Sequence, residues 1–301
     1  MNKLLVIGSI STDFNVKTHS LPQIGETVAG DNFSISFGGK GANQAIAASR
    51  LGAEVLMAGT VGNDMFADQL INNLVQNQIN VDYVERHLSF ESGAAHITKY
   101  NNDNSIIYIA AANDEITLDR VEDLKKIFKE VDYIVIQNEI PIDMVIAIIR
   151  ICYDEGVKVI YNPAPAETVD QEIIDKVSLF TPNESEFHKI FPDLTIEEGL
   201  MKFPNKMIIT LGSEGVAYYD GSQVIKVPSY TVDVTDTTGA GDTFNGALAF
   251  ALSNNKPLKE SIYFANLAAA LSVQKYGAQE GMPTADEIKT SDYFDTDWDI
   301  Y

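Results

Sequence analysis

A glycine turn followed by a carboxylate, within residues 236–246, is the strongest chemical signal in this sequence. The Gly-Ala-Gly turn at 239–241 opens an apolar helix predicted over 240–252, and backbone amides at a helix N-terminus bind anions. Asp242 lies in the first turn, where it can accept the proton of a substrate hydroxyl while the amides hold a transferring phosphoryl group. The alternative interpretation is that Asp242 only caps the helix.

A second glycine-rich segment, 37–45, leads from a predicted strand into a helix. Its three glycines allow the backbone to lie against a ligand. Lys40 supplies a positive charge, and the Asn43 amide can both donate and accept hydrogen bonds with hydroxyls. The segment lacks the Walker A pattern, and the first strand is followed by one glycine, Gly8, rather than by GxGxxG. A flexible turn is the alternative interpretation.

Further polar residues follow predicted strands. Asp13 and Glu139 come after apolar runs, and ligands of α/β sheets bind at the carboxyl ends of strands. Two carboxylates near glycines suit sugar hydroxyls, although a surface loop would also explain each one. Asn183 and Glu186 fit a helix capping box, or they order water around a magnesium–nucleotide complex. The turn 210–215 is either a tight hairpin or a nucleotide contact.

Short apolar runs alternate with longer amphipathic segments along the chain. The predicted strands are 4–10, 55–60, 133–137, 157–161, 179–181 and 207–211. The predicted helices are 42–51, 66–76, 118–128, 143–153, 184–190, 240–252 and 261–276. This pattern predicts an α/β fold: a mostly parallel central sheet with helices on both faces.

Two stretches, 14–37 and 95–111, alternate with period two instead. Such alternation predicts strands with one face solvated or covering a ligand. Because these stretches interrupt the α/β pattern, we expect them to form a small β lid over the carboxyl edge of the sheet. We expect residues 1–301 to form a single domain.

The composition limits the possible partners. The chain has 43 acidic and 21 basic residues, a formal charge of −22, and the resulting field repels nucleic acid and anionic membranes. Its one cysteine, Cys152, excludes an internal disulfide and a cysteine-based zinc site. Apolar runs are too short to span a bilayer, so we expect a cytoplasmic protein.

Together these segments resemble the PfkB family of carbohydrate kinases. The resemblance runs in order along nearly the whole chain, from Gly8-Ser9 and Asp13 through 38–45, 162–166, 181–184 and 210–212 to 239–246. It implies that family's α/β fold, ATP and magnesium as co-substrate and cofactor, and a homodimer joined through the lids. It also implies phosphorylation of the primary hydroxyl of a small sugar, with D-ribose giving ribose 5-phosphate as the first expectation. Another sugar, 2-deoxyribose or a nucleoside is the alternative.

The resemblance further implies roles for single residues. Asp242 resembles the catalytic base, with an anion hole formed by the amides of Gly239, Ala240 and Gly241. Sugar-contacting positions are Ser11, Asp13, Gly39, Lys40, Gly41, Asn43, His96, Glu139 and Asp242. Nucleotide-contacting positions are Asn183, Glu186, Thr210, Gly212, Gly215, Gly241 and Asn266, of which Asn183 and Glu186 match a magnesium-linked motif. Positions for an activating potassium ion, bound mostly through backbone carbonyls, are Asp236, Thr238, Ser272, Lys275, Gly277 and Gly281.

Four positions depart from the pattern. Ser11 replaces a sugar-contacting Asn, His96 replaces a small apolar residue, and Ala111 replaces a Gly. These three lie on the sugar side, so phosphoryl transfer is the firmer expectation and ribose the weaker one. Gly281 replaces a Ser, which predicts weakened potassium binding.

Two other classes of function fit the sequence less well than a kinase does. A non-catalytic sugar or nucleotide sensor is disfavoured because Asp242 and the Gly-Ala-Gly turn are intact. A nicotinamide-dependent dehydrogenase is disfavoured because GxGxxG is missing.

Overall fold

A six-stranded parallel sheet forms the centre of the molecule. The computed structural model describes residues 2–100 and 103–295. The strand order is β10-β9-β8-β1-β4-β5, and all the pairs are parallel. The bounds are β1 Lys3–Ile7, β4 Glu54–Val61, β5 Asn80–Arg86, β8 Tyr133–Ile136, β9 Val159–Tyr161 and β10 Leu179–Phe180. The fold class expected from the alternating pattern is therefore confirmed.

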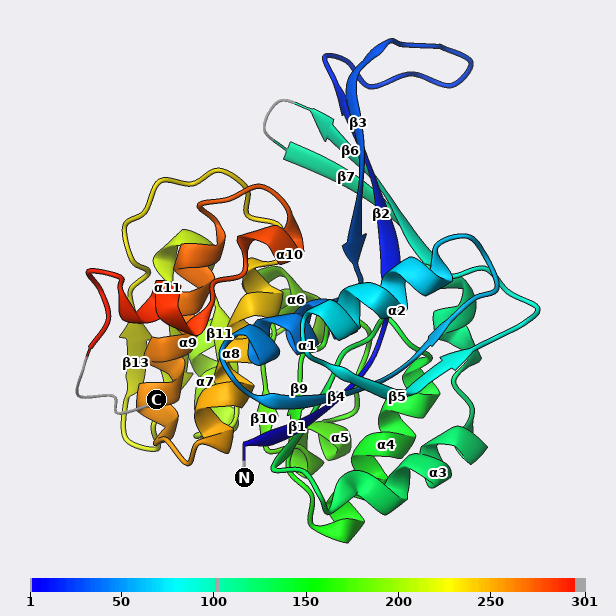
Figure 1. Cartoon of the computed structure of the whole chain (residues 1–301). Helices are drawn as coiled ribbons and strands as arrows, with labels where there is room; N and C mark the ends of the chain where they lie inside the picture. The colour runs from blue at the N-terminus through cyan, green and yellow to red at the C-terminus, as the bar shows by residue number, and fades with distance from the viewer. Residues whose placement is uncertain (1, 101–102, 296–301) are drawn as a thin grey trace.

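Helices cover both faces of this sheet (Figure 1). Alternate residues of β1 enter different cores, with Leu4 and Val6 on one side and Leu5 and Ile7 on the other. The first core is closed by α1 Lys40–Arg50, α2 Ala67–Gln76, α8 Ala240–Ser253, α9 Leu258–Ser272 and α11 Ala285–Lys289. The second is closed by α3 Leu118–Phe128, α4 Ile142–Glu155, α5 Gln171–Lys176, α6 Glu184–Ile190 and α7 Ile196–Lys202. Continuously apolar strands are explained by this burial on both faces.

The last predicted strand, 207–211, starts a separate antiparallel sheet. That sheet contains β11 Ile208–Thr210, β12 Val216–Tyr219 and β13 Val224–Val227. Isolated parallel bridges connect Phe180 with Met207 and Asn183 with Thr210, so this sheet continues from the edge of the central one. The turn 210–215 contains a short 3-10 helix, Gly212–Glu214, between β11 and β12.

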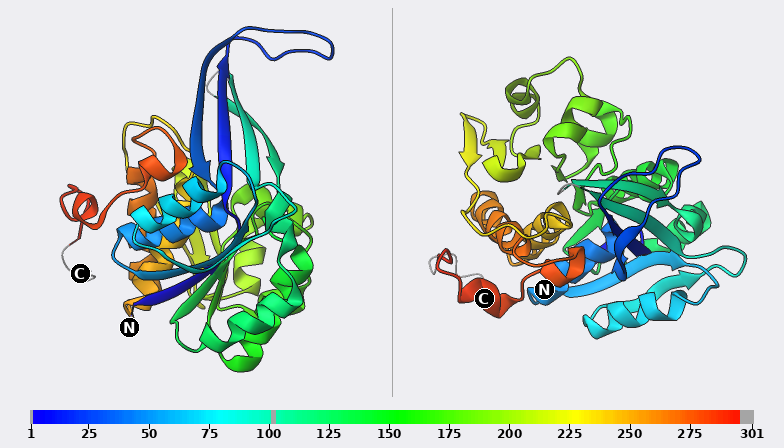
Figure 2. Two further views of the ribbon diagram at one scale, coloured as in Figure 1. Left: turned by 45° about the vertical axis from the view of Figure 1, so that its right-hand side comes forward. Right: turned by 90° about the horizontal axis from the view of Figure 1, so that it is seen from above.

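A four-stranded sheet projects from the carboxyl edge of the central sheet (Figures 1 and 2). Its order is β3-β2-β6-β7, with β2 Ser11–Thr18, β3 Gly30–Gly38, β6 Gly93–Tyr100 and β7 Asp103–Ile109. β2 and β6 start before the predicted stretches 14–37 and 95–111, and β2 pairs with β6 in parallel. Residues 101 and 102, within the second stretch, lie outside the described part of the chain.

Two close backbone approaches bring the starts of α1 and α8 together. A Cβ atom on Gly41 would lie 2.6 Å from the carbonyl carbon of Gly8, so α1 begins almost in contact with the end of β1. A Cβ atom on Gly246 would lie 2.6 Å from the Cβ of Ala47, so α8 crosses α1 at very short range. Glycine at both positions therefore allows the two glycine-rich segments to meet at the sheet edge.

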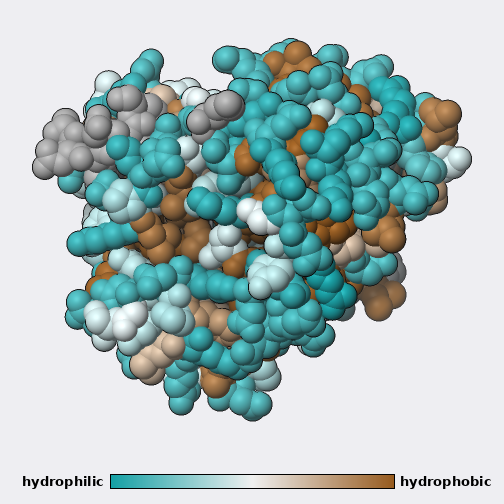
Figure 3. Space-filling model, turned by 90° about the horizontal axis from the view of Figure 1, so that it is seen from below, coloured by the Kyte–Doolittle hydropathy of each residue, from teal (hydrophilic) through white to brown (hydrophobic). Residues whose placement is uncertain are grey.

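The face seen from below, away from the four-stranded sheet, is largely hydrophilic, with apolar side chains in a few groups (Figure 3). Within residues 2–100 and 103–295, no helix combines the length and the apolarity that crossing a bilayer requires.

Candidate active site

Asp242 lies where the first turns of α1 and α8 meet. Its side chain is nearly buried, and each carboxylate oxygen accepts a hydrogen bond from a side-chain amide of α1. Asn43 Nδ2 donates to Oδ2 at 2.9 Å, and Gln44 Nε2 donates to Oδ1 at 3.1 Å. A carboxylate oxygen can accept more than one hydrogen bond, so both oxygens keep capacity for a substrate hydroxyl. Asp242 is thus oriented by neutral donors.

The two amides are themselves held by further amides. Gln44 Nε2 also donates to Asn162 Oδ1 at 3.1 Å, and its Oε1 accepts from Gln137 Nε2 at 2.8 Å. Asn43 Oδ1 accepts from Gln279 Nε2 at 2.9 Å. Our sequence prediction did not assign a site role to Gln44, Gln137, Asn162 or Gln279. Gln44 and Asn162 nevertheless lie inside segments 38–45 and 162–166, which carry the family resemblance.

Glu139 and Asp13 lie on the other side of the glycine-rich segment. Glu139 Oε2 accepts from Ser9 Oγ at 2.6 Å and from the Lys40 backbone amide at 2.9 Å. Burial, followed by the nearby Glu139 charge, raises the pKa of Asp13 to about 7. Ser11 Oγ, 3.5 Å from Asp13 Oδ1, acts in the opposite direction. Asp13 and Ser11 are both buried, and the Glu139 charge acts on Asp13. The structure therefore brings Ser11, Asp13 and Glu139 together, three of the predicted sugar-contacting side chains.

Lys40 is the cation in the middle of this acidic region. Burial lowers the pKa of its ammonium, but surrounding carboxylates outweigh burial and raise the pKa above its ordinary value. In descending order of effect these carboxylates are Asp242, Glu139, Glu186 and Asp13. The Gly39 that precedes Lys40 has φ of 91°, a backbone conformation that favours glycine.

His96 and Asp13 lie on different faces of the four-stranded sheet. His96 lies opposite Phe14 in the β2–β6 ladder and stacks on its ring, with centroids 5.3 Å apart. Asp13 lies opposite Ala95, and directly paired residues share a face of the sheet. His96 is therefore exposed on the face turned away from Asp13, so this structure does not bring it together with Asp13, and its contact with the sugar stays a prediction.

Other side chains of the four-stranded sheet lie on the Asp13 face. Ala95 and Ile97 alternate with His96, and Tyr108 is the ladder partner of Ala95. The Tyr108 hydroxyl donates to the backbone oxygen of Glu139 at 3.0 Å. The period-two pattern contained this information, but the register relative to Asp13 was needed to use it.

A cavity of about 170 Å³ opens beside Asp242. Its lining includes Lys40, Asn162, Asn183, Glu186, Thr210, Gly239, Gly241 and Asp242. The first amides of a helix have no intrahelical partner, and the Gly239-Ala240-Gly241 turn places those of α8 at this cavity. The arrangement can therefore hold a phosphoryl group next to a carboxylate.

A larger cavity of about 520 Å³ adjoins the first, since Thr210 and Gly241 line both. Its lining also includes Gly212, Gly215 and Asn266, three predicted nucleotide contacts, together with apolar side chains of β12, α8 and α9. The volume is typical of a cavity for a small organic ligand. Asn266 Nδ2 donates to the Pro228 carbonyl at 2.8 Å, so part of its amide holds the cavity wall.

The capping-box interpretation of Asn183 and Glu186 is confirmed, and the magnesium–nucleotide interpretation stays a prediction. They form the capping box of α6, with Asn183 N to Glu186 Oε2 and Glu186 N to Asn183 Oδ1 both at 2.8 Å. Both also line the smaller cavity. Burial raises the pKa of Glu186, and the Asp242 charge adds to this.

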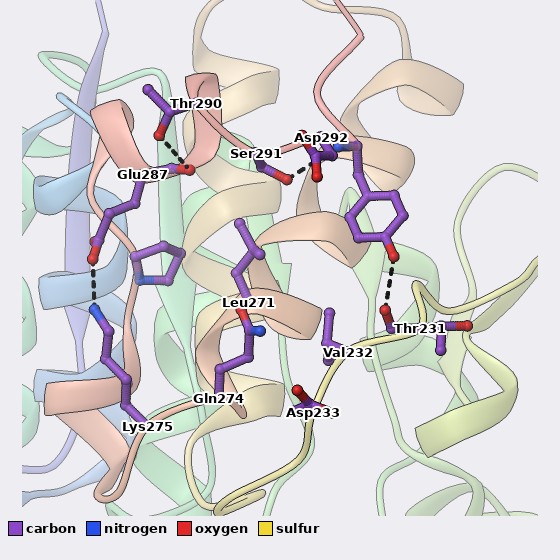
Figure 4. Close-up of a pocket in the computed structure, with 13 residues that line it drawn as sticks. Thr231, Val232, Asp233, Leu271, Gln274, Lys275, Glu287, Thr290, Ser291 and Asp292 are labelled. Atoms are coloured by element: carbon purple, nitrogen blue, oxygen red, sulfur yellow. Dashed lines mark hydrogen bonds and ion pairs between the residues drawn. The ribbon is translucent and has the colours of Figure 1, made fainter.

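The residues predicted to bind a monovalent cation lie near one another, but the side chains of several already bind other protein groups. Asp236 Oδ2 accepts from Lys99 Nζ at 2.8 Å, and the Lys275 ammonium lies 2.5 Å from Glu287 Oε1 (Figure 4). Ser272 Oγ donates to the Ala269 carbonyl at 2.8 Å. A further cavity of about 530 Å³ lies beside these residues, between the loop at 231–233, α9 and α11. Figure 4 shows the side chains that line it.

Gly281 does not simply lack a ligand. A Cβ atom at this position would lie 2.3 Å from the Ser272 carbonyl oxygen and 3.8 Å from that of Lys275. A serine at 281 would therefore require the backbone to shift. Among the described residues, no group of three or more His, Cys, Asp or Glu side chains could hold a metal ion.

The sequence and the fold were compared with known proteins. The model of the pfkB family carbohydrate kinases matches residues 1–285. A ribokinase of Lactococcus lactis is 47% identical over 293 residues, with 96% of each chain covered. A ribokinase of Bacillus subtilis is 46% identical over 293 residues, with 96% of this chain and 99% of the relative covered.

A solved ribokinase structure has the same fold. The Arabidopsis thaliana ribokinase complexed with ribose and ATP superposes with a TM-score of 0.82 at 29% identity. The match covers 94% of this chain and 96% of that one. The similarity therefore extends through the whole α/β architecture.

The raised pKa of Asp13 predicts how the free energy of unfolding changes with pH. The folded state loses stability as the pH rises from about 3.8 to about 7, because an unfolded Asp ionises near its ordinary pKa of 3.8 while the folded Asp13 stays protonated up to about 7. Asp13→Asn should therefore raise the free energy of unfolding at pH 8, on the order of 2–4 kcal/mol, since one pKa unit corresponds to about 1.4 kcal/mol. At pH 4 the change should be small. Urea unfolding at both pH values tests this, with exposed Asp193→Asn as control. An equal effect of Asp13→Asn at the two pH values would contradict it.

Proposed function

The chain belongs to the pfkB family of carbohydrate kinases, phosphotransferases that act on an alcohol group, and we propose D-ribose as its substrate. In the proposed reaction, ATP phosphorylates the primary hydroxyl and ribose 5-phosphate is released. The observation that carries this proposal is the buried Asp242 carboxylate beside the Gly239-Ala240-Gly241 turn, at the cavity next to the nucleotide-sized one. The ribokinases described above support ribose as the sugar.

In the proposed mechanism Asp242 is the general base. One of its oxygens accepts the proton of the sugar hydroxyl, while Asn43 and Gln44 keep the carboxylate oriented. The α8 amides stabilise the charge on the transferring phosphoryl group. Lys40 lies between the sugar side and the phosphate side, so its ammonium offsets negative charge there. Asp13 and Glu139 accept hydrogen bonds from sugar hydroxyls.

The smaller cavity offers few protein ligands to a magnesium ion. Glu186 and Asn183 are the oxygen ligands at the smaller cavity that would hold the ion through water. Bound magnesium would neutralise phosphate charge, as in other phosphoryl transfers. A single carboxylate at that position suits an ion that keeps most of its waters and binds chiefly to phosphates.

We propose that the four-stranded sheet is a lid whose two faces have different roles. The Asp13 face covers the sugar and excludes water that would otherwise take the phosphoryl group. Ser11, two residues from Asp13 on the same face, is the position at which we expect ribose and 2-deoxyribose to be distinguished.

The opposite face is proposed to bind a second copy of the chain. It carries exposed Ile35 and Ile107 in ladder positions beside Phe14 and His96, with exposed Phe33 and Ile109 farther along the same face. Four large apolar side chains on one small sheet favour burial against an equivalent sheet.

The kinase proposal predicts the product and the cost of removing the base. With ATP and magnesium, the protein should release ADP and convert ribose to its 5-phosphate, with lower kcat/KM for 2-deoxyribose, hexoses and nucleosides. Asp242→Asn should lower kcat by about 10²- to 10⁴-fold, the usual effect of losing an acid–base group. Glu197→Gln, in the first turn of α7, is the matched control and should be unaffected. Near-normal turnover by Asp242→Asn, or no sugar phosphate, would overturn the proposal.

The dimer proposal predicts that the species in solution has twice the mass of the chain. In sedimentation velocity the native chain should behave as a dimer, and the pair of substitutions Phe33→Ser and Ile107→Ser should shift it towards the monomer. Ile24→Ser, an exposed apolar residue in the loop between β2 and β3, is the control. A native monomer at all concentrations would refute the proposal.

A further inference from the structure

Lys99 connects the four-stranded sheet with the loop that precedes the anion-binding turn. It lies on β6 at the end of the β6–β7 hairpin, on the face that carries Ala95 and Ile97. Its Nζ lies 2.8 Å from Asp236 Oδ2, and the two side chains are 33% and 10% exposed. The residues are 137 positions apart in the sequence, so no local requirement explains this contact.

Asp236 in turn fixes the turn beside the phosphate site. Its Oδ1 accepts from Thr238 N at 3.0 Å and from Thr238 Oγ1 at 2.6 Å. Its Oδ2 also accepts from the Gly277 amide at 3.3 Å. Burial raises the pKa of Asp236, but these hydrogen bonds and that of Lys99 together lower it to about 2. The carboxylate is therefore charged, and it determines how the chain enters Gly239.

The other charged groups near this loop leave Lys99 as the partner of Asp236. Lys275 lies on the nearby segment after α9, but its ammonium is directed to Glu287 at 2.5 Å (Figure 4). Glu280 lies over Gly277 and adds negative charge to the same region. Among the ion pairs that the described residues form, the one at Asp236 is with Lys99.

This arrangement disagrees with a simple potassium site at Asp236. The sequence resemblance places a dissociable monovalent cation on this carboxylate, whereas the structure places a lysine ammonium there. Both carry one positive charge, and both are held by oxygen atoms. They cannot occupy the same position at once, so a potassium ion at the position of the Lys99 ammonium must displace Lys99.

We propose that Lys99 is a tethered cation, which competes with a dissociable monovalent cation for Asp236 and holds the anion-binding turn when the lid is in place. The proposal rests on the function proposed above for that turn. A group tethered in one chain competes at an effective concentration in the millimolar range or higher. The native protein should therefore respond weakly to potassium, and removal of the ammonium should create a strong response.

Thermal unfolding tests this independently of turnover. The midpoint temperature is measured in choline chloride and as a function of potassium chloride at constant ionic strength. Lys99→Met should unfold at a lower temperature than the native protein in choline chloride, and potassium should restore its midpoint. The half-saturating potassium concentration should be at least about 10-fold lower than in the native protein, because the competitor is gone. Lys99→Arg keeps a tethered charge and should behave like the native protein.

The matched control is Lys17→Met. Lys17 is exposed and lies opposite Lys99 in the β2–β6 ladder. Its replacement by Met therefore removes one positive charge from the same sheet and leaves the ion pair of Asp236 intact. Equal potassium responses of native protein and Lys99→Met would overturn the proposal, as would a Lys99→Arg variant that responds like Lys99→Met. The kinase assay on the same variants separates the two proposals. If no sugar is phosphorylated, the proposed function fails, while the unfolding data still decide the role of Lys99.

Discussion

The site depends on one interaction, the pair of amide hydrogen bonds that hold the Asp242 carboxylate between α1 and α8. A buried carboxylate is costly unless hydrogen bonds replace its water. Asn43 and Gln44 supply them from 199 and 198 residues away in the sequence, so the two glycine-rich segments must meet before the site exists. Close backbone packing at Gly41 and Gly246 makes that meeting possible. The fold therefore keeps the starts of α1 and α8 in contact.

Electrostatics sets the second constraint. A chain with a formal charge of −22 repels nucleotides in general, so a phosphate can be bound only where this field is locally offset. The α8 amides do so without adding a charge, and Lys40 does so with one. Lys99 provides a second positive charge at Asp236, next to the same turn. Both lysines border the region between the two sheets, where sugar and phosphate are proposed to meet.

The sequence predicted the parts of this molecule that depend on local pattern. Apolar strands alternating with amphipathic helices identified the parallel sheet, and the two glycine-rich segments meet at its edge. Facts that depend on long-range register were missed. The alternation around His96 indicates a strand, but it does not give the face of His96 relative to Asp13. Gln44 was not recognised as a partner of Asp242, and Lys99 was not recognised as the partner of Asp236, because each pair joins segments that are distant in sequence.

The most direct test of this account is a double-mutant cycle on kcat between Gln44 and Asp242. Gln44→Met removes the amide at similar volume, and loss of one hydrogen bond to a charged group corresponds to about 1.5–3 kcal/mol, or roughly 10- to 100-fold. If Gln44 acts through Asp242, its replacement should lower kcat in the native background and change little in the Asp242→Asn background. Equal fold-losses in both backgrounds would mean that Gln44 does not act by positioning Asp242, and would contradict the account.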